Sequence, residues 1–428
     1  EDILKLMDVS SGRNRGRIYR IVHNSSKRVL AKRLGDASAN ELISALESPN
    51  AWTRETAQRL LIQQQDESTI KLLRKMIANS DSPKARLHAL WTNEVLSGND
   101  EGTILAALTY PHPAVRQNAV RVVARHMDSH PHVAKAIVAL ANDQNLRVRY
   151  QVAFTLGTLT DRKAAINALA AIVAQNADDA HIRTAVLSGV PTEADQLLFA
   201  LARNEVFKSD KEAALLDQIA GVIAARGDED EVNRTIAFAT SDQVPPGSRP
   251  TIVLSLAEGL SRGGQSFRDV IDRQGDVVRT RIERLLEEAR TTAADTKQAT
   301  ERRRQSIQLL RYCPWEKVGS LLSSLLKAQE PVDIQLASIR SISAFDNAEV
   351  ASQLIVGWRG LSPTVRGEAA EALLARDERA SALLEAIRDG KIPAANLDPV
   401  RQQVLLKHRD AKVRALAVDV FGKIALPA

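Results

Sequence analysis

The sequence predicts an all-α solenoid in which helix pairs follow one another along the chain. A turn rich in Pro, Asp and Asn recurs, and each copy continues into an apolar residue, an arginine and an apolar stripe with helical spacing. Aromatic residues make up only 4% of the 428 residues, and a core of Ala, Leu and Val suits close-packed helices better than sheets. Because the chain is too long for one compact core, we expect the copies to bury their stripes against one another.

The segment PHPAVRQNAVRVVARH at 111–126 shows the pattern clearly. Val115, Ala119, Val122 and Val123 fall at i, i+4, i+7 and i+8, on one face of a helix that begins after a proline. The same arrangement follows SPNAWTR, DSPKAR, DQNLRVR and DDAHIR, and it returns as LSPTVR and HRDAKVR. The first five arginines of the series are spaced by 32, 30, 33 and 34 residues. The series comprises Arg54, Arg86, Arg116, Arg149, Arg183, Arg366 and Arg414.

An apolar helix precedes the turn, as in ELISALES before Arg54 and TILAALTY before Arg116. The unit is therefore a helix, a short turn and a second helix that begins at the apolar-Arg pair. With about 40 residues per pair, residues 34–428 would form roughly ten or eleven pairs. The pattern is irregular around 259–311, where 279–311 predicts longer, charged, solvent-facing helices. We expect four glycines to interrupt helices here: Gly259, Gly263, Gly264 and Gly275.

The runs DSPKARLHA, PHPAVRQNA and LSPTVRGEA resemble the turn and second helix of HEAT repeats. The resemblance covers about residues 38–225 and 330–425. It implies a HEAT/armadillo-like α-α superhelix in which stacked helix pairs present a large curved face.

Residues 1–33 differ from the rest of the chain. The run NRGRIYRIV at 14–22 alternates in the manner of a strand and predicts a short N-terminal β segment. Residues 1–33 contain nine Lys/Arg and three acidic residues, which equals the net charge of +6. The other 395 residues contain 49 basic and 49 acidic side chains.

The run GRIYRI resembles the closing strand of a glucose/sorbosone-dehydrogenase-like β-propeller. Residues 398–422 resemble the final repeat of a membrane-bound dehydrogenase family that combines this propeller with HEAT repeats and a C-terminal c-type cytochrome domain. The resemblance implies that 1–33 is the end of a propeller plus a basic linker, and that the chain is a periplasmic piece of a longer exported oxidoreductase. The one cysteine, Cys313, lies in YCPWEK and not in C-x-x-C-H. We therefore expect no cofactor in this chain and haem c only in a domain beyond Ala428.

We accordingly expect a non-catalytic scaffold whose partners are protein domains. One alternative is a nucleic-acid-binding HEAT protein of the DNA-glycosylase-like kind, but phosphate binding needs concentrated positive charge, which the neutral body lacks. Another is a HEAT-type lyase or a chaperone for a cofactor, which would need a polar pocket with an acid that the sequence does not identify. No uncharged apolar run approaches the ~18 residues of a membrane span.

The arginine series is the candidate site. In HEAT-type stacks such arginines lie near the start of the second helix and bond to turn carbonyls and Asp side chains. Asp81, Asp143 and Asp178 lie five or six residues before an arginine and could accept such bonds. A ligand-binding ridge on the concave face is the alternative, since 103–190 contains nine basic and five acidic side chains. No residue is assigned to catalysis, a cofactor or a metal.

The sequence favours structural roles for the histidine group, the arginine run and the one cysteine. His126, His130 and His132 fit an exposed loop better than a metal site, since Pro131 disfavours helix at the residue before it. The run Arg302–Arg304 is typical of a solvated helix face. Cys313 is expected to be a buried structural thiol, because the sequence identifies no base to activate it. No G-x-G-x-x-G, Walker, G-x-S-x-G or H-E-x-x-H motif occurs.

Overall fold

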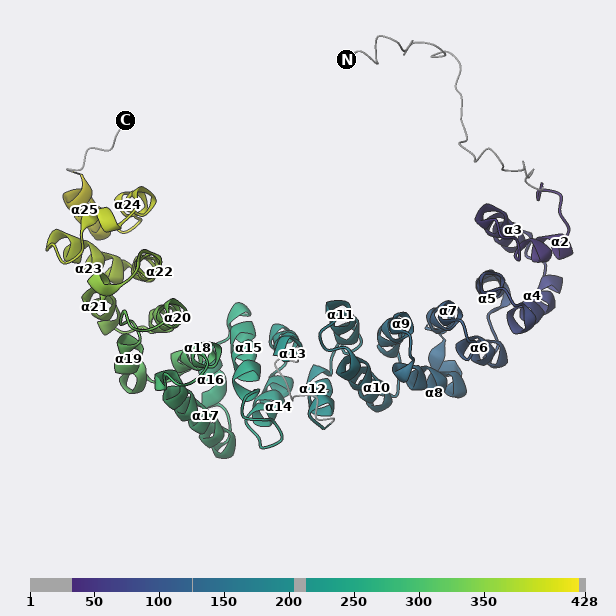
Figure 1. Cartoon of the computed structure of the whole chain (residues 1–428), viewed down its shortest axis with the longest axis horizontal. Helices are drawn as coiled ribbons and strands as arrows, with labels where there is room; N and C mark the ends of the chain where they lie inside the picture. Colours follow the sequence, from purple (N-terminus) through teal and green to yellow (C-terminus); the bar gives the residue numbers. More distant parts are fainter. Residues whose placement is uncertain (1–32, 125, 204–212, 423–428) are drawn as a thin grey trace, which may run out of the picture. The chain divides into compact units, whose positions relative to one another are not determined.

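The computed structural model describes residues 33–124, 126–203 and 213–422. Within these ranges the chain forms 24 α-helices and no strand, so the predicted all-α class is confirmed. The strand predicted at 14–22 lies outside the described residues. The chain divides between Val122 and Val123 into two compact units, and in each of them helices alternate between two layers (Figure 1).

The first unit contains three helix pairs. Helices α2, α4 and α6 form its first layer, and α3, α5 and α7 form its second layer. The bounds are α2 (Ala39–Ala45), α3 (Ala51–Gln64), α4 (Ser68–Asn79), α5 (Pro83–Ser97), α6 (Glu101–Leu108) and α7 (Pro113–Val123).

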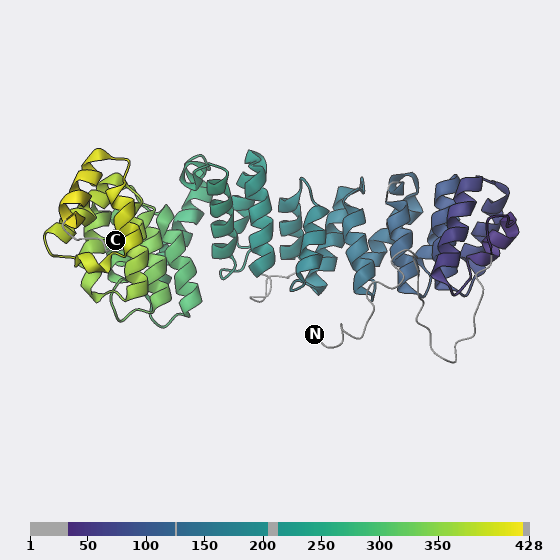
Figure 2. The ribbon, with the colours of Figure 1, turned by 90° about the horizontal axis from the view of Figure 1, so that it is seen from above.

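The second unit shows the same kind of alternation. Its first layer contains α8, α10, α12, α14, α17, α19, α21 and α23, and its second layer contains α9, α11, α13, α15, α18, α20 and α22 (Figure 1). Seen from above, neighbouring helices within this unit run side by side (Figure 2). The bounds are α8 (Pro131–Ala139), α9 (Leu146–Leu156), α10 (Arg162–Gln175), α11 (Ala180–Ser188), α12 (Ala194–Arg203), α13 (Ala213–Arg226), α14 (Glu229–Ala239), α15 (Arg249–Arg262), α16 (Phe267–Asp272), α17 (Asp276–Ala294), α18 (Thr300–Leu309), α19 (Trp315–Ser324), α20 (Val332–Ser343), α21 (Glu349–Val356), α22 (Pro363–Leu374), α23 (Asp377–Arg388), α24 (Pro399–Leu406) and α25 (Ala411–Phe421). Short 3₁₀ turns occur at η1 (Met127–Ser129), η2 (Leu140–Asn142), η4 (Leu310–Tyr312), η5 (Trp358–Gly360) and η6 (Ala394–Asn396).

The recurring turns place the starts of the second-layer helices. The side chains of Asn50, Ser82, Asn145, Asp179 and Ser362 each accept a backbone N–H from the first turn of the helix that follows. Such N-caps satisfy donors that have no partner within the helix. The polar residue of each turn therefore fixes where its helix begins, and the apolar stripe then faces the core.

The irregular middle is built from a short helix and a long one. Helix α16 has 6 residues and α17 has 19, and the buried side chains of α17, from Ile282 to Ala293, lie on one face. Gly275 precedes α17 as its N-cap, and Gly264 has a φ of 77°, so these two glycines do lie between helices.

The expectation that Gly259 interrupts a helix is wrong. Gly259 lies inside α15, and a Cβ added there would stand 2.3 Å from the Cβ of Ala224 in α13. The glycine therefore allows two second-layer helices to approach closely. No described helix is long and apolar enough to cross a membrane.

Candidate functional site

The arginines of the series close the turn between the two helices of a pair. Each is the fourth residue of its helix, at the start of α3, α5, α7, α9, α11, α22 or α25. Arg54 donates from Nη1 to the carbonyls of Ser48 and Pro49 at 2.7 and 2.9 Å. Arg414 likewise donates to the carbonyl of His408 at 2.6 Å. A side chain at this position points toward the helix N-terminus, so it reaches the free carbonyls at the end of the preceding helix.

The other members of the series make equivalent bonds. Arg116 donates to the Tyr110 carbonyl at 2.8 Å, and Arg366 donates to the Trp358 carbonyl at 3.2 Å. Arg86 donates to the carbonyls of Ser80 and Ile77, and its guanidinium lies 4.0 Å from the centre of the Tyr110 ring.

Two arginines also link their pair to the next one. Arg149 donates to the Asp143 carbonyl and, through Nη2, to Oδ1 of Asn176, both at 2.6 Å. Arg183 donates to the Ala177 carbonyl at 2.8 Å and to Oε1 of Gln218 in α13 at 2.9 Å.

The hydrogen bonds described for these arginines go to backbone carbonyls and not to the suggested Asp carboxylates. Arg149 bonds to the backbone carbonyl of Asp143, while the carboxylate of Asp143 accepts the N–H of Asn145. Arg86 and Arg183 bond to the carbonyls of Ser80 and Ala177, which precede Asp81 and Asp178. The arginines thus neutralise helix-end carbonyls, where a positive charge is favourable.

The fourth residue of the helix also closes turns in the irregular middle and near the C-terminal end, which the sequence analysis did not predict. The fourth residues of α17, α18, α20 and α24 also donate to carbonyls of the preceding turn. These residues are Arg279, Arg303, Gln335 and Gln402. The signal in the sequence that could have identified them is an Arg or a Gln four residues after the N-cap residue of a helix.

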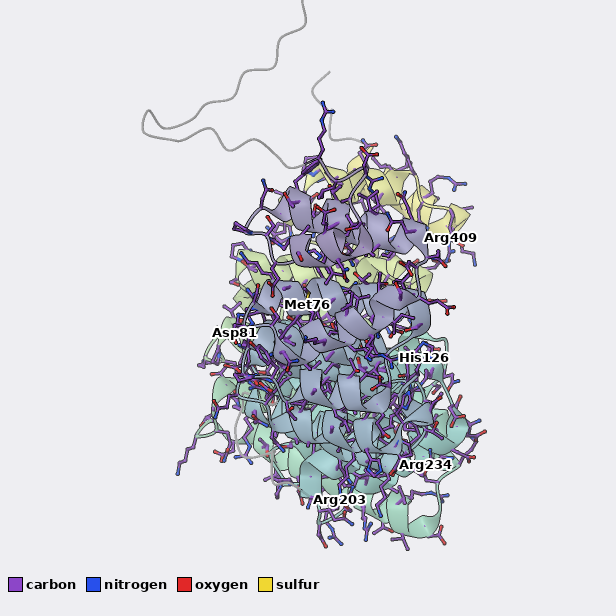
Figure 3. All side chains as sticks on the ribbon, turned by 90° about the vertical axis from the view of Figure 1, so that its right-hand side faces the viewer. Met76, Asp81, His126, Arg203, Arg234 and Arg409 are labelled. Atoms are coloured by element: carbon purple, nitrogen blue, oxygen red, sulfur yellow. The ribbon has the colours of Figure 1, made fainter. Side chains whose placement is uncertain are left out.

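The basic run at 302–304 is not a uniform solvated face. Arg303 is buried, and Arg304 pairs with Glu301 in the same helix. Arg302 is exposed. Arg409, on the outside of the helices in Figure 3, is also exposed and pairs with Asp377 at 3.5 Å. The histidine group lies at η1 and the start of α8, and the described residues contain no group of three His, Cys, Asp or Glu side chains that could hold a metal ion.

An apolar stripe on α9 faces solvent. Leu146 and Phe154 are 39% and 40% exposed, and the half-buried Tyr150 packs edge-on against Phe154 with ring centres 5.0 Å apart. Helix α11 lies beside α9 and adds Thr184 and the half-buried Leu187. We call these residues of α9 and α11, together with the exposed Arg147 and His181, the α9–α11 surface.

The α9–α11 surface is free of negative charge along both helices. Neither α9 nor α11 contains an Asp or Glu, whereas α13, α15, α18, α20 and α22 each contain at least one. The acids that precede the two helices are engaged in turns: Asp179 accepts the N–H groups of His181 and Ile182 at 2.8 and 3.1 Å. The exposed cation Arg147 therefore has no competing carboxylate on its own helix or on α11.

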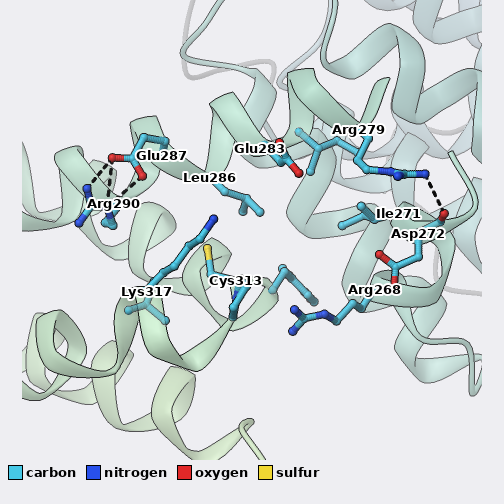
Figure 4. A pocket seen from close by; sticks show the side chains of 14 residues that line it. Arg268, Ile271, Asp272, Arg279, Glu283, Leu286, Glu287, Arg290, Cys313 and Lys317 are labelled. Carbon is cyan, nitrogen blue, oxygen red and sulfur yellow. Dashed lines mark hydrogen bonds and ion pairs between the residues drawn. The ribbon is translucent and has the colours of Figure 1, made fainter. Parts of the chain in front are cut away.

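A second concave feature lies in the irregular middle, where α16, α17, η4 and α19 surround a cavity of about 160 Å³ (Figure 4). Its lining combines aliphatic side chains with four cationic and three acidic ones, and Cys313 lies among them. Burial raises the pKa of the Cys313 thiol to about 11, although Lys317, Arg268 and Arg290 lower it in part. The thiol is therefore protonated at neutral pH, as a structural cysteine would be.

One segment of the chain matches a family model. Residues 102–189 match the model described as HEAT repeats. No curated protein matches the chain.

The solved structures to which the chain is similar include complexes of Kap121p and Kap95p. With Kap121p bound to Nup53p the identity is 12% and the TM-score 0.43, over 89% of this chain and 48% of that chain. With Kap121p bound to the extreme C-terminus of the protein phosphatase Cdc14p the identity is 10% and the TM-score 0.47, over 90% of this chain and 45% of that chain. With Kap95p in its RanGDP complex the identity is 14% and the TM-score 0.36, over 90% of this chain and 60% of that chain. The chain thus spans about half the length of the Kap121p chains.

Proposed function

We propose that this chain is a non-catalytic protein-binding scaffold, and that its α9–α11 surface contacts an acidic segment of a partner protein. The observation that carries the proposal is the exposed Leu146–Tyr150–Phe154 stripe on helices that contain no acidic residue. The partner segment would place apolar side chains on the stripe and a carboxylate against Arg147.

The physical basis is the cost of exposing this stripe. Apolar surface that a partner removes from water contributes about 25 cal/mol per Å². Aromatic side chains such as Tyr150 and Phe154 are also the residues that most often dominate interface energies. Complementary charges across the interface raise the association rate and the specificity more than they raise the affinity.

A nucleic-acid partner is less well supported by the same surface. Arg149 and Arg183 bond to turn carbonyls and to side-chain amide oxygens, so several of their donors are already engaged. Arg147 is left as the exposed arginine of α9, whereas tight phosphate binding needs several concentrated cations.

The test compares the wild-type chain with the variant Leu146→Ser/Phe154→Ser. Both chains would be immobilised, and proteins from the source cell's lysate would be identified by quantitative mass spectrometry. We expect a partner that the wild type retains and the variant loses by at least about tenfold. The purified partner should then bind the wild type more weakly as salt rises, because an Arg147–carboxylate contact is screened.

The matched control is Val277→Ser/Val356→Ser, which removes two exposed apolar side chains from α17 and α21. It should retain the same partner as the wild type. Retention of an identical set of proteins by all three chains would overturn the proposal, provided that circular dichroism shows the same helix content.

We further propose, on sequence resemblance, that the chain is the spacer between a β-propeller and a cytochrome c domain in an exported dehydrogenase. The supporting features are the GRIYRI run near the N-terminus and the final repeat at 398–422, where the chain forms α24 and α25. The reading frame around this segment tests it. A C-x-x-C-H motif after Ala428 and propeller blades before Glu1 are expected, and their absence from the full gene would refute it.

A further inference from the structure

The cavity beside Cys313 has an apolar floor and charged edges. Ile271 is contributed by α16, Ile282 by α17 and Val318 by α19, and all three are buried. The Cys313 thiol lies among them and is 5% exposed. Because the thiol is protonated at neutral pH, the floor offers no charge to a ligand.

Cations flank the thiol on two sides. In the close view the Lys317 side chain extends past Cys313 toward Leu286, and Arg268 lies on the other side of Cys313 (Figure 4). Neither Lys317 nor Arg268 forms an ion pair with an acidic side chain in the described part of the chain. Arg290 is different, because it pairs with Glu287 at 2.6 Å.

Charged side chains of the lining act on the thiol. Lys317, Arg268, Arg290 and Glu287 have the largest electrostatic effects on the pKa of Cys313, and only Glu287 of these is acidic. Three cations and one acid therefore surround the thiol end of the cavity. The local field there favours an anion.

We propose that this cavity binds a small apolar carboxylate, with its aliphatic or aromatic group on the Ile271–Ile282–Val318 floor and its carboxylate near Lys317 and Arg268. The volume of about 160 Å³ suits one such group, because an apolar cavity of about 150 Å³ holds benzene. The chemistry is that of a free organic acid or of the C-terminal residue of a peptide. The inference does not depend on the α9–α11 surface.

The test uses 3-phenylpropionate as the probe and the neutral 3-phenylpropionamide as its matched control. Equilibrium dialysis measures binding directly. We expect saturable binding of the acid with a Kd on the order of 1 mM, as suits a ligand of this size. The amide should bind at least about fivefold more weakly, because it lacks the charge that Lys317 and Arg268 recognise.

Cys313 supplies a second readout, since it is the only cysteine of the chain. Bound acid should slow its alkylation by N-ethylmaleimide, followed by intact mass, at the concentration that saturates dialysis. The variants Lys317→Gln and Arg268→Gln should each weaken the acid at least about fivefold. Lys327→Gln, a change at an exposed lysine outside the cavity, should leave binding unchanged.

Three results would overturn the inference. They are no saturable binding of the acid, equal binding of the acid and the amide, or unchanged binding in Lys317→Gln and Arg268→Gln. The variant Leu286→Trp, which fills the cavity from α17, should abolish binding if the site is correctly placed. The peptide acetyl-Gly-Phe, with a free or an amidated C-terminus, distinguishes a free organic acid from the C-terminal residue of a peptide. If the peptide with the free C-terminus binds more tightly than 3-phenylpropionate, the ligand is a peptide C-terminus.

Discussion

Arg303 of α18 holds the carboxylate of Glu330 in a two-pronged bond. Its Nη1 and Nη2 donate to Oε2 and Oε1 at 2.7 and 3.0 Å, and its Nε donates to the Ala293 carbonyl at 3.1 Å. Only 4% of the Arg303 side chain and 14% of the Glu330 side chain are exposed. One arginine therefore ties the end of α17 to the turn that precedes α20.

Replacing Glu330 with Ala should destabilise this region by about 3 kcal/mol, because it leaves a buried guanidinium without its counter-charge. The loss should appear as faster amide hydrogen exchange across 293–341. Local exchange is the suitable readout, since a repeat array need not unfold in one step.

The double variant Arg303→Met/Glu330→Leu should recover much of this loss, since it removes both charges together. The exposed pair Arg290–Glu287 is the control, and Arg290→Ala should leave exchange across α17 unchanged. Equal exchange in Glu330→Ala and the wild type would show that the pair adds nothing.

Arg149→Met should destabilise the α8–α11 region by about 2 kcal/mol. The change removes charged hydrogen bonds to Asp143 and Asn176 and leaves those oxygens without a donor. Thermal unfolding and exchange across residues 140–180 measure the loss. Arg147→Met, two residues earlier and exposed, should leave stability nearly unchanged. If both variants unfold alike, the turn-closing role of Arg149 is wrong.

Gly259→Ala should cost about 1–3 kcal/mol, because its new Cβ would stand 2.3 Å from the Cβ of Ala224. Gly221→Ala, in the facing helix α13, is the matched control. No atom lies within 4 Å of a Cβ at Gly221, so that change should stabilise α13 by about 0.5–1 kcal/mol. Opposite signs in thermal melts are the expected result, and a stabilising Gly259→Ala would contradict the close helix approach.

The first unit should lose stability in mild acid through His88. Burial lowers the pKa of His88 below the ordinary 6.5, and the positive charge of Arg54 lowers it further. As pH falls through 6.5 the unfolded chain binds the proton first, so the free energy of unfolding decreases with decreasing pH. The protection of the amides of residues 51–97 against hydrogen exchange, relative to the intrinsic exchange rate at each pH, should decrease from pH 7.5 to 5.5.

His88→Gln should flatten that dependence, since glutamine can still bond to Gln58 but carries no titrating group. In the wild type Nδ1 of His88 lies 2.7 Å from Oε1 of Gln58. An unchanged pH dependence in His88→Gln would assign the effect to another group.

The repeat pattern predicted the second-layer helices well because three local signals agree in it. A capping residue, an apolar residue and an arginine occur together, as in NLRVR at the start of α9. Arg279 follows the same geometry, but its turn lacks a proline; Gln335 follows Pro331, but a glutamine stands there in place of the arginine. Local signals of this kind vary where a long helix such as α17 replaces a regular one.

The candidate sites were harder to predict than the fold. The α9–α11 surface depends on which side chains remain uncovered after stacking, and sequence periodicity places Phe154 on a helix without showing its exposure. The cavity brings Arg268, Ile282 and Lys317 together from three helices, and no single run of sequence contains that arrangement. Burial of Arg303 between the exposed Arg302 and the half-buried Arg304 likewise depends on Glu330, 27 positions further on.

The closing of a turn by an arginine of the same helix pair has a consequence for how such a chain can lengthen. Arg54, Arg116 and Arg414 reach carbonyls only five or six residues back, so each of these pairs brings both halves of this bond with it. Duplication or deletion of one whole pair would leave the turns of all other pairs intact. A cut inside a pair would instead separate an arginine from its carbonyls. Insertions and deletions of about 30 to 34 residues are therefore the changes in length that this architecture tolerates best.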